Sequence, residues 1–414
     1  MPGATVGASP LSDLRTFDFP LQTSYFRLLY LHIPFCKQAC SYCNFHFSTN
    51  LKQRGAVLDA MVHELQLRRG ELPETTVPSI YFGGGTPSLL TAAELDRLFA
   101  AIEEAGYWRG EADTEITLEA NPDDLDSVTV AALAASPVNR LSIGVQSFDQ
   151  EDLRFMNRAH NATEAREAVE RVRTAGFANL SIDLIYGAQT TSDGTWARNL
   201  ELATSLPVNH IAAYALTVEP KTALGHRVEA GKVPDTDDDK FARHFDLLID
   251  HLEAAGFEHY EISNFARPGH RSRHNSGYWT GQPYLGIGPG AHSFDGRYRR
   301  RWNVSNNATY ARAWKEVHDA ADYAAAATLL YEEEQLSERD RYNEYVMTGL
   351  RRNEGIDLTD LATRFGREAA DHFAREVAAH LTAGTLHQVP PGGIYRLTRT
   401  GLAVADGIAA DAFR

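Results

Sequence analysis

Short apolar runs alternate with helix-like stretches between residues 26 and 257. The runs are about four to eight residues long, as buried strands are, and the stretches between them have the apolar spacing of helices. Six strands are predicted, at 27–32, 79–82, 115–119, 140–145, 179–186 and 210–216, and five helices, at 56–69, 91–105, 127–135, 163–175 and 241–255. Strands that alternate with helices form parallel sheets. The pattern therefore predicts a partial, TIM-like (β/α)6 barrel at 26–257.

This alternation ends at residue 258. Residues 258–309 are rich in His, Arg, Asn, Gly and aromatic residues, so we expect this stretch to be too polar and too rich in glycine to join a core. We expect residues 258–330 as a whole to complete the barrel and to connect it to the remainder of the chain.

A helical pattern returns near residue 336. A capped helix is predicted from Asp357 through Ala378, and 384–398 has the pattern of a hairpin, with two prolines and two glycines at its turn. Helices followed by a hairpin predict a smaller, winged-helix-like α+β domain at 331–414.

Charge limits the partners that this chain can bind. The 414 residues carry a net charge of -15, which argues against a nucleic-acid partner. The winged-helix-like domain has 14 acidic and 10 basic side chains, so we expect its wing to cap the barrel or present something to it rather than to bind DNA.

Residues 1–25 are expected to be an N-terminal extension, because they lack the basic and apolar regions of a signal peptide. No apolar run approaches the ~20 residues of a membrane span. These features predict a cytoplasmic protein that is not integral to the membrane.

All three cysteines of the chain lie within eight positions, at Cys36, Cys40 and Cys43. Their odd number and close spacing disfavour a disulfide. A zinc site with His32 or His46 as fourth ligand is one interpretation, although the usual paired C-x2-C knuckles are missing. The other is a [4Fe-4S] cluster held by three thiolates, which leaves one iron without a protein ligand.

The spacing C-x3-C-x2-C, with Tyr42 before the last cysteine, closely resembles the signature of the radical S-adenosylmethionine (SAM) superfamily. The resemblance implies that the open iron chelates the amino and carboxylate groups of SAM. It also implies that one-electron reduction of the sulfonium yields a 5'-deoxyadenosyl radical, while the protein aligns the cofactors and excludes water.

Other polar candidates follow the predicted strands at their C-terminal ends, where barrel enzymes place their active sites. The glycines at 83–85 are expected to let backbone N–H groups approach a ligand. Asp183 and Glu119 are carboxylates in otherwise apolar strands and need partners if buried. Arg158 has two interpretations: a residue of the site, or a residue on the surface of a helix without a functional role.

The resemblance assigns ten residues to SAM binding. They are Tyr30, Tyr42, Gly84, Gly85, Thr86, Glu119, Gln146, Arg158, Asp183 and Ala215. No residue is assigned a catalytic role.

Within the superfamily the chain resembles the anaerobic coproporphyrinogen III oxidase subfamily, with two departures. The oxidases carry a fourth cysteine where this chain has Phe45. The stretch from His274 to Trp279 reads HNSGYW and matches the HNxxYW motif of the heme chaperones in this subfamily, the HemW proteins.

This second resemblance implies that His274, Tyr278 and Trp279 contact heme. Imidazole can ligate heme iron and arginines can pair with propionates. Two other histidines and three arginines lie near the motif, at His270, His292, Arg267, Arg271 and Arg273. The alternative is that the motif only braces a loop against the barrel.

Three functions follow from these features. The first is a heme chaperone that binds a [4Fe-4S] cluster and SAM and transfers heme to an acceptor, such as a membrane heme protein. The second is an oxygen-independent coproporphyrinogen III oxidase, an enzyme of porphyrin biosynthesis. The third is a zinc-binding module without catalysis.

Overall fold

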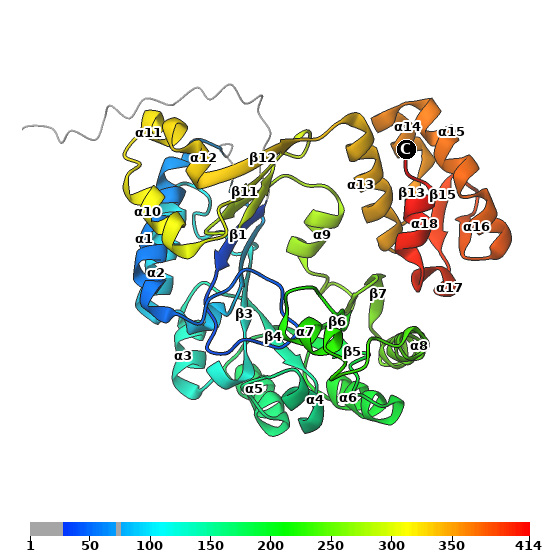
Figure 1. Ribbon diagram of the computed structural model, residues 1–414, viewed down its shortest axis with the longest axis horizontal. Helices are drawn as coiled ribbons and strands as arrows, with labels where there is room; N and C mark the ends of the chain where they lie inside the picture. The colour runs from blue at the N-terminus through cyan, green and yellow to red at the C-terminus, as the bar shows by residue number, and fades with distance from the viewer. Residues whose placement is uncertain (1–27, 72–75) are drawn as a thin grey trace, which may run out of the picture.

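Six parallel strands form the centre of one sheet and confirm the six predicted strands. The computed structural model describes residues 28–71 and 76–414, so the extension predicted at 1–25 lies outside the described residues. The six strands lie side by side in chain order (Figure 1). They are β1 (Leu28–Ile33), β2 (Ser79–Gly84), β3 (Glu115–Ala120), β4 (Arg140–Gln146), β5 (Asn179–Tyr186) and β6 (His210–Ala215).

Helices cover the outer face of these strands, where alternate residues such as Leu31, Phe82 and Leu118 are fully buried (Figure 1). The predicted helices are confirmed as α1 (Arg54–Leu67), α2 (Ala92–Glu104), α3 (Ser127–Ala135), α5 (Ala162–Thr174) and α8 (Asp238–Ala254). The structure adds α4 (Gln150–Phe155), α6 (Asp193–Ser205) and α7 (Ala223–Glu229), which were not predicted. Because side chains alternate along a strand, the remaining positions face inward, and many of them are polar.

The stretch 258–309 is partly core, so the expectation that it is too polar for a core is wrong. It adds β7 (Glu258–Glu261) and β8 (Asn264–Ala266) beyond β6, and β9 (Tyr284–Ile287), which pairs in parallel with β1. Antiparallel strands β10 (His292–Phe294), β11 (Arg299–Asn303) and β12 (Tyr331–Gln335) extend that edge. Leu285 and Ile287 of β9 are fully buried.

Four helices complete this region. They are α9 (Arg273–Trp279), α10 (Asn307–Lys315), α11 (Ala320–Ala325) and α12 (Ala327–Leu330).

A buried carboxylate explains how a polar segment joins the core. Glu64 of α1 is 0% exposed and forms an ion pair with the equally buried Arg68 over 2.8 Å. Glu64 also accepts hydrogen bonds from the Asn303 side chain (2.8 Å), the Tyr310 hydroxyl (2.6 Å) and the Gly288 backbone N–H (2.9 Å). Its partners thus come from β11, α10 and the turn after β9. These hydrogen bonds satisfy the polar groups that made the segment look too polar for a core.

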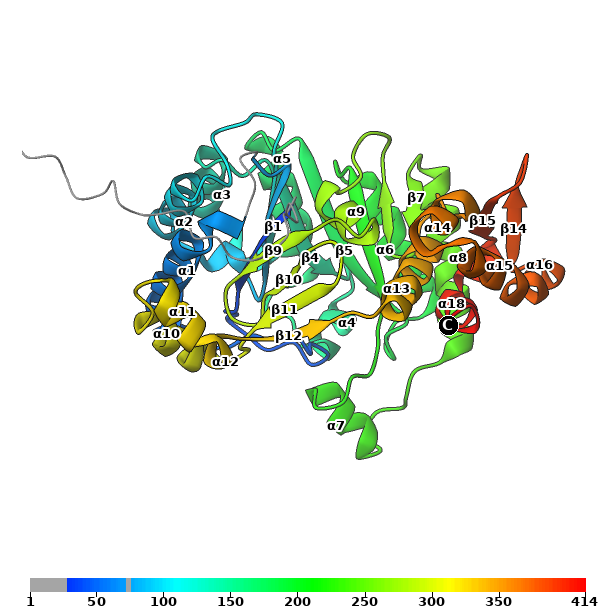
Figure 2. The same cartoon turned by 90° about the horizontal axis from the view of Figure 1, so that it is seen from above.

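The C-terminal domain has its own core, centred on residues such as Tyr342, Val346 and Phe373. Its elements are α13 (Glu338–Arg351), β13 (Ile356–Asp357), α14 (Leu358–Phe365), α15 (Arg367–Glu376), α16 (Ala378–Ala383), β14 (Leu386–Val389), β15 (Ile394–Leu397), α17 (Arg399–Leu402) and α18 (Ala405–Asp411). The predicted hairpin is confirmed as β14–β15. Figure 2 shows this domain at one end of the sheet and α10–α12 at the other.

The single helix predicted from Asp357 through Ala378 is wrong, because the chain forms separate helices there. Gly366 lies between α14 and α15 with φ +87°, a left-handed conformation that ends a helix. In the described part of the chain, no helix is long and apolar enough to cross a membrane.

We expect Glu64→Ala to lower the free energy of unfolding by about 3–5 kcal/mol, because it removes one of the two carboxylates that pair with the buried Arg68 guanidinium, the other being Glu71. It also leaves the buried Tyr310 hydroxyl without its acceptor. The matched control is Asp59→Ala on the same helix. Asp59 pairs with Arg97, but their side chains are 66% and 49% exposed, so its loss is expected to cost about 0–1 kcal/mol. Denaturant unfolding of both variants measures the difference, and similar losses would contradict a structural role for the buried pair.

Candidate functional site

A cavity of about 1200 Å³ opens at the C-terminal end of the parallel strands. All three cysteines line it, together with nine of the ten residues assigned to SAM by resemblance. These nine are Tyr42, Gly84, Gly85, Thr86, Glu119, Gln146, Arg158, Asp183 and Ala215. Residues from 36 to 215 in the chain thus meet at one rim, because the carboxyl ends of parallel strands lie at one edge of a sheet.

Cys36, Cys40 and Cys43 are free thiols in the loop that follows β1, residues 34–48, here called the cysteine loop. Thr86 Oγ1 donates a hydrogen bond to Cys36 Sγ over 3.4 Å, and Arg158 Nη1 donates to Cys40 Sγ over 3.2 Å. Burial raises the pKa of Cys36 to about 11 and also raises that of Cys43. Donors aimed at the sulfur atoms favour thiolates, and a bound cation would do so more strongly.

The zinc interpretation needs His32 or His46 as a fourth ligand, and both rings have other partners. His32 Nε2 bonds to the backbone oxygen of His46 over 2.9 Å and His32 Nδ1 to the Tyr30 hydroxyl over 3.1 Å. His46 Nε2 bonds to Asn307 Oδ1 over 2.8 Å. Within the described residues, no group of three or more His, Cys, Asp or Glu is arranged to hold a single metal ion. Both histidines would have to give up these hydrogen bonds to ligate zinc, which disfavours the zinc interpretation.

Arg158 is a cavity residue, so its interpretation as a surface helix residue is wrong. It lies in the turn after α4, and Nη2 donates to Asn121 Oδ1 over 2.6 Å and to the Gly144 backbone oxygen over 2.7 Å. With its bond to Cys40, the guanidinium joins the ends of β3 and β4 to the cysteine loop.

Glu119 and Asp183 face the cavity from β3 and β5. Glu119 accepts hydrogen bonds from the Tyr81 hydroxyl (2.8 Å) and from Gly84 N (3.1 Å), and Asp183 accepts one from Ser142 Oγ (3.1 Å). Burial raises the pKa of Glu119 to about 7 and that of Asp183 to about 6. Neither carboxylate has an ion-pair partner among the described residues. A cationic ligand in the cavity would therefore stabilise their ionised forms.

The glycine-rich turn packs against β1 and β3. Gly84 N donates to Glu119, and Gly85 N donates to the Ile33 backbone oxygen over 2.9 Å. The approach of a ligand to these backbone groups stays a prediction. A Cβ on Gly85 would lie 2.7 Å from Phe35 N and Phe35 O. The glycine is therefore required by the close approach of β1 and β2.

Gln146 ends β4 with φ +67°, which is rare for a residue other than glycine, and the β4–β5 register shifts between Ile143 and Gln146. Such strain clusters at functional sites. The structure also places Ser142 and Asn121 in the cavity wall, and sequence analysis missed both. Asn121 follows the end of β3, two residues after Glu119, so the placement of polar residues at strand ends could have identified it. Ser142 lies inside β4, before the register shift, and no sequence signal distinguished it.

The C-terminal domain reaches the same cavity through its helices, and no residue of the hairpin expected to cap the barrel is in the lining. The lining includes Arg351 of α13 and residues 402–407, which run from the end of α17 into α18. Arg399 anchors this segment through an ion pair with Asp246 of α8 over 2.9 Å.

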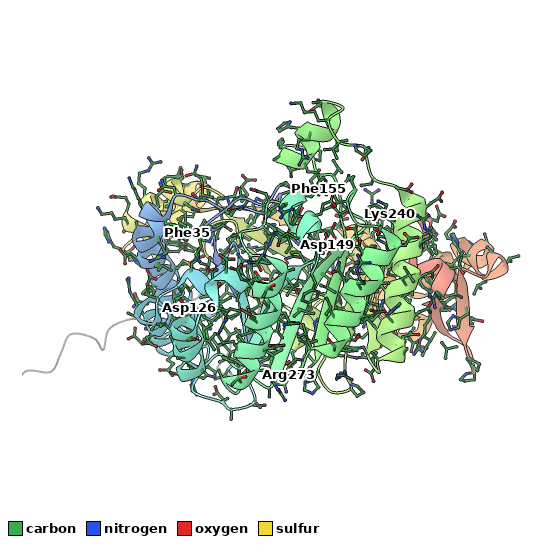
Figure 3. The ribbon with its side chains drawn as sticks, turned by 90° about the horizontal axis from the view of Figure 1, so that it is seen from below. Phe35, Asp126, Asp149, Phe155, Lys240 and Arg273 are labelled. Carbon is green, nitrogen blue, oxygen red and sulfur yellow. The ribbon has the colours of Figure 1, made fainter. Side chains whose placement is uncertain are left out.

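Tyr30 and the HNxxYW motif lie away from the cavity lining. Tyr30 faces the barrel interior and bonds to His32. His274 is fully buried at the opposite end of the strands, where its Nδ1 bonds to Ser79 Oγ and its Nε2 to the Tyr278 hydroxyl, both over 3.0 Å. Ser79 is the first residue of β2. Figure 3 shows Arg273 at one end of the strands and Phe35 and Phe155 toward the other.

Trp279 and the arginines near the motif also have partners within the protein. The Arg351 guanidinium carbon lies 5.0 Å from the centroid of the Trp279 ring. Arg271 pairs with Glu354 over 2.7 Å, and Arg267 stacks on Phe257. These contacts are the ones expected if the motif braces a loop against the barrel. Heme contact by His274, Tyr278 and Trp279 stays a prediction, and it requires these side chains to give up their present contacts.

Comparison with known proteins adds the family. A model of the radical SAM superfamily matches residues 30–203, and a model of the HemN C-terminal domain matches residues 336–404. Heme chaperone HemW of Mycobacterium tuberculosis (strain ATCC 25618 / H37Rv) is 37% identical over 80% of this chain and 83% of its own. This chain belongs to the HemW family. Heme chaperone HemW of Bacillus subtilis (strain 168) is 30% identical over 86% of this chain and 92% of its own.

The same architecture is known from a solved structure. Coproporphyrinogen III oxidase (HemN) from Escherichia coli, a radical SAM enzyme, matches with a TM-score of 0.79 over 94% of this chain and 91% of that one. At 24% identity the likeness concerns the fold alone. It confirms the predicted radical SAM partial barrel followed by a smaller C-terminal domain.

The raised pKa values predict how the stability of this HemW-family chain depends on pH. Between about pH 4.5 and 7 the folded protein retains the Glu119 proton that the unfolded chain has released, so the free energy of unfolding falls as pH rises through this range. We expect Glu119→Gln, which cannot ionise, to stabilise the cofactor-free protein at pH 8 by on the order of 1–3 kcal/mol. Asp183→Asn should act in the same direction.

Denaturant midpoints at pH 5 and pH 8 test this. Glu103→Gln on the exposed side of α2 serves as control and should leave both midpoints unchanged. A Glu119→Gln protein with the same pH dependence as wild type would show that the Glu119 carboxyl group is not buried as described.

Proposed function

We propose that this HemW-family chain is a heme chaperone that holds a [4Fe-4S] cluster on Cys36, Cys40 and Cys43, binds SAM beside it, and passes heme to an acceptor protein. The observation that carries the proposal is the convergence of three free cysteines and nine family-implied SAM residues on one cavity. The family membership supplies the chaperone role. Free thiols suit a reducing compartment such as the cytoplasm.

Three thiolates leave one iron of such a cluster open to a ligand. When bound together, cluster and SAM supply one-electron chemistry at the SAM sulfonium. Around them the chain supplies fixed groups. Thr86 and Arg158 donate to Cys36 and Cys40 and so favour the thiolates, while Glu119 and Asp183 offer carboxylates to the positive charges of SAM.

For the cargo we propose the HNxxYW motif, with His274 as iron ligand and Tyr278 and Trp279 beside the macrocycle. Two observations support this assignment. Trp279 Nε1 is buried without a hydrogen-bond partner, and His274 is held neutral, because burial lowers its pKa to about 3. A neutral imidazole is the form that ligates iron. The bonds to Ser79 and Tyr278 must then exchange for the bond to iron.

The cofactor proposal is tested by anaerobic reconstitution with iron and sulfide, followed by SAM, a reductant and coproporphyrinogen III. We expect about four irons per chain, SAM binding by calorimetry and no protoporphyrinogen. Replacement of Cys36, Cys40 or Cys43 by Ser should abolish the cluster absorption, because each removes one of three ligands. Protoporphyrinogen formed over many turnovers would contradict the chaperone proposal and favour the oxidase.

The heme proposal is tested by titrating ferric heme into the reconstituted protein and following the Soret band. We expect His274→Ala to weaken heme binding at least tenfold and to shift the band, because it removes the iron ligand. The matched control is His210→Ala. His210 is equally buried, and its nitrogens bond to Ser181 Oγ (2.7 Å) and the Tyr260 hydroxyl (2.8 Å). Equal effects of both variants would show that His274 acts only as a brace.

A further inference from the structure

A second depression, of about 610 Å³, lies beside the cysteine loop on the outside of the barrel. Its walls come from the cysteine loop, the end of α4 and the start of α7. Cys40, Cys43 and Phe45 line this depression and the main cavity alike. The cysteine loop is therefore the partition between the two, and anything that Cys40 and Cys43 hold lies next to the outer surface.

Three cations line this depression, and its lining contains no acidic side chain. They are Arg154, Lys221 and Arg227. The whole chain has a net charge of -15, so this positively charged patch is opposite in sign to the protein as a whole. None of the three belongs to an ion pair with another described residue. Arg227 instead lies over the Phe155 ring, 5.2 Å from its centroid.

The walls of the depression are tied together. Ser41 Oγ donates to the Phe155 backbone oxygen over 3.0 Å, and Leu224 N donates to the Ser41 backbone oxygen over 2.7 Å. Asn157 Nδ2 donates to the Ala39 backbone oxygen over 2.7 Å. α7 projects from the body of the molecule, with Phe155 at its base (Figures 2 and 3). A fixed surface of this kind costs little ordering entropy on binding.

Phe45 adds an apolar contact. Phe45 lies two residues after Cys43, and its side chain is 71% exposed. This is the largest exposure among the exposed aromatic side chains of the described residues. An exposed aromatic ring beside arginines is the composition of a protein interface. Lysines and arginines around it attract partners of negative charge and speed their encounter.

We propose that Arg154, Lys221, Arg227 and Phe45 form the docking surface for a small acidic electron-transfer protein, of the flavin or iron–sulfur kind, which delivers electrons through the cysteine loop. This rests on the proposed cluster. One electron passes from the partner to the cluster at each encounter, so the partner is oxidised by one electron and the cluster reduced by one, and no bond forms between them. The sign of the patch and its place behind Cys40 and Cys43 select this class of partner.

The experiment uses the reconstituted full chain and a flavodoxin of net negative charge as probe. Calorimetry measures its affinity in the oxidised state, and stopped-flow absorption measures cluster reduction by its hydroquinone. We expect the charge-reversed variant R154E/K221E/R227E to lose at least tenfold in affinity and in reduction rate at low salt. In wild type both should fall with added salt, and in the variant this dependence should disappear.

The matched control is K52E/R312E/K315E, which changes the net charge equally at exposed positions, one just before α1 and two on α10. It should bind and accept electrons nearly as wild type does. F45A should weaken binding without changing its salt dependence, because Phe45 carries no charge. Photoreduction by a deazaflavin, which needs no docking protein, should proceed equally in all variants.

Three outcomes would overturn the docking surface: no binding of flavodoxin to wild type, equal losses in both triple variants, or binding of anionic lipid vesicles by these cations in place of flavodoxin. Failure of the proposed function is distinguishable. It would be seen before any partner is added, as a preparation without cluster absorption or one that deazaflavin cannot reduce.

Discussion

The close contact between Gly85 and the backbone of Phe35 determines where the rest of the site lies. Gly85 N donates to the Ile33 backbone oxygen, and a side chain at Gly85 would collide with Phe35. The ends of β1 and β2 can therefore meet, which brings the cysteine loop against the glycine-rich turn and places Thr86 within 3.4 Å of Cys36. Since the neighbouring strands are parallel, their polar ends arrive at the same rim.

A polar barrel interior needs a strong apolar layer elsewhere, and this fold supplies it outside the strands. The helices pack there against Leu31, Phe82 and Leu118, while the opposite strand faces carry carboxylates, serines and histidines. The part of the sheet beyond β1 is stabilised by a buried ion pair and its hydrogen bonds. Glu64 and Arg68 form a buried ion pair; Glu71 also pairs with Arg68, and groups from β9 to α10 donate to Glu64. A buried charge is tolerated only when it is satisfied so completely.

The two ends of the barrel have different characters. The rim with Cys36, Glu119 and Asp183 is open and lined by potential cofactor ligands, whereas the end with His274 is closed, with both ring nitrogens bonded. The two ends are connected through Tyr81 of β2. Its ring centroid lies 4.8 Å from that of the His274 ring, and its hydroxyl donates to Glu119 at the rim. Under the proposed function this tyrosine lies between the cofactor site and the proposed heme ligand.

The sequence by itself determined the six strands, most helices and the shared site of the three cysteines. These depend on signals a few residues apart, such as the length of the apolar runs, the apolar spacing of the helices between them, and the spacing from Cys36 to Cys43. Only the tertiary structure decided that Arg158 reaches Cys40, that His274 lies at the closed end against Ser79, and that residues 258–309 contribute to the core. Those outcomes depend on contacts between residues more than a hundred positions apart, which no local pattern encodes.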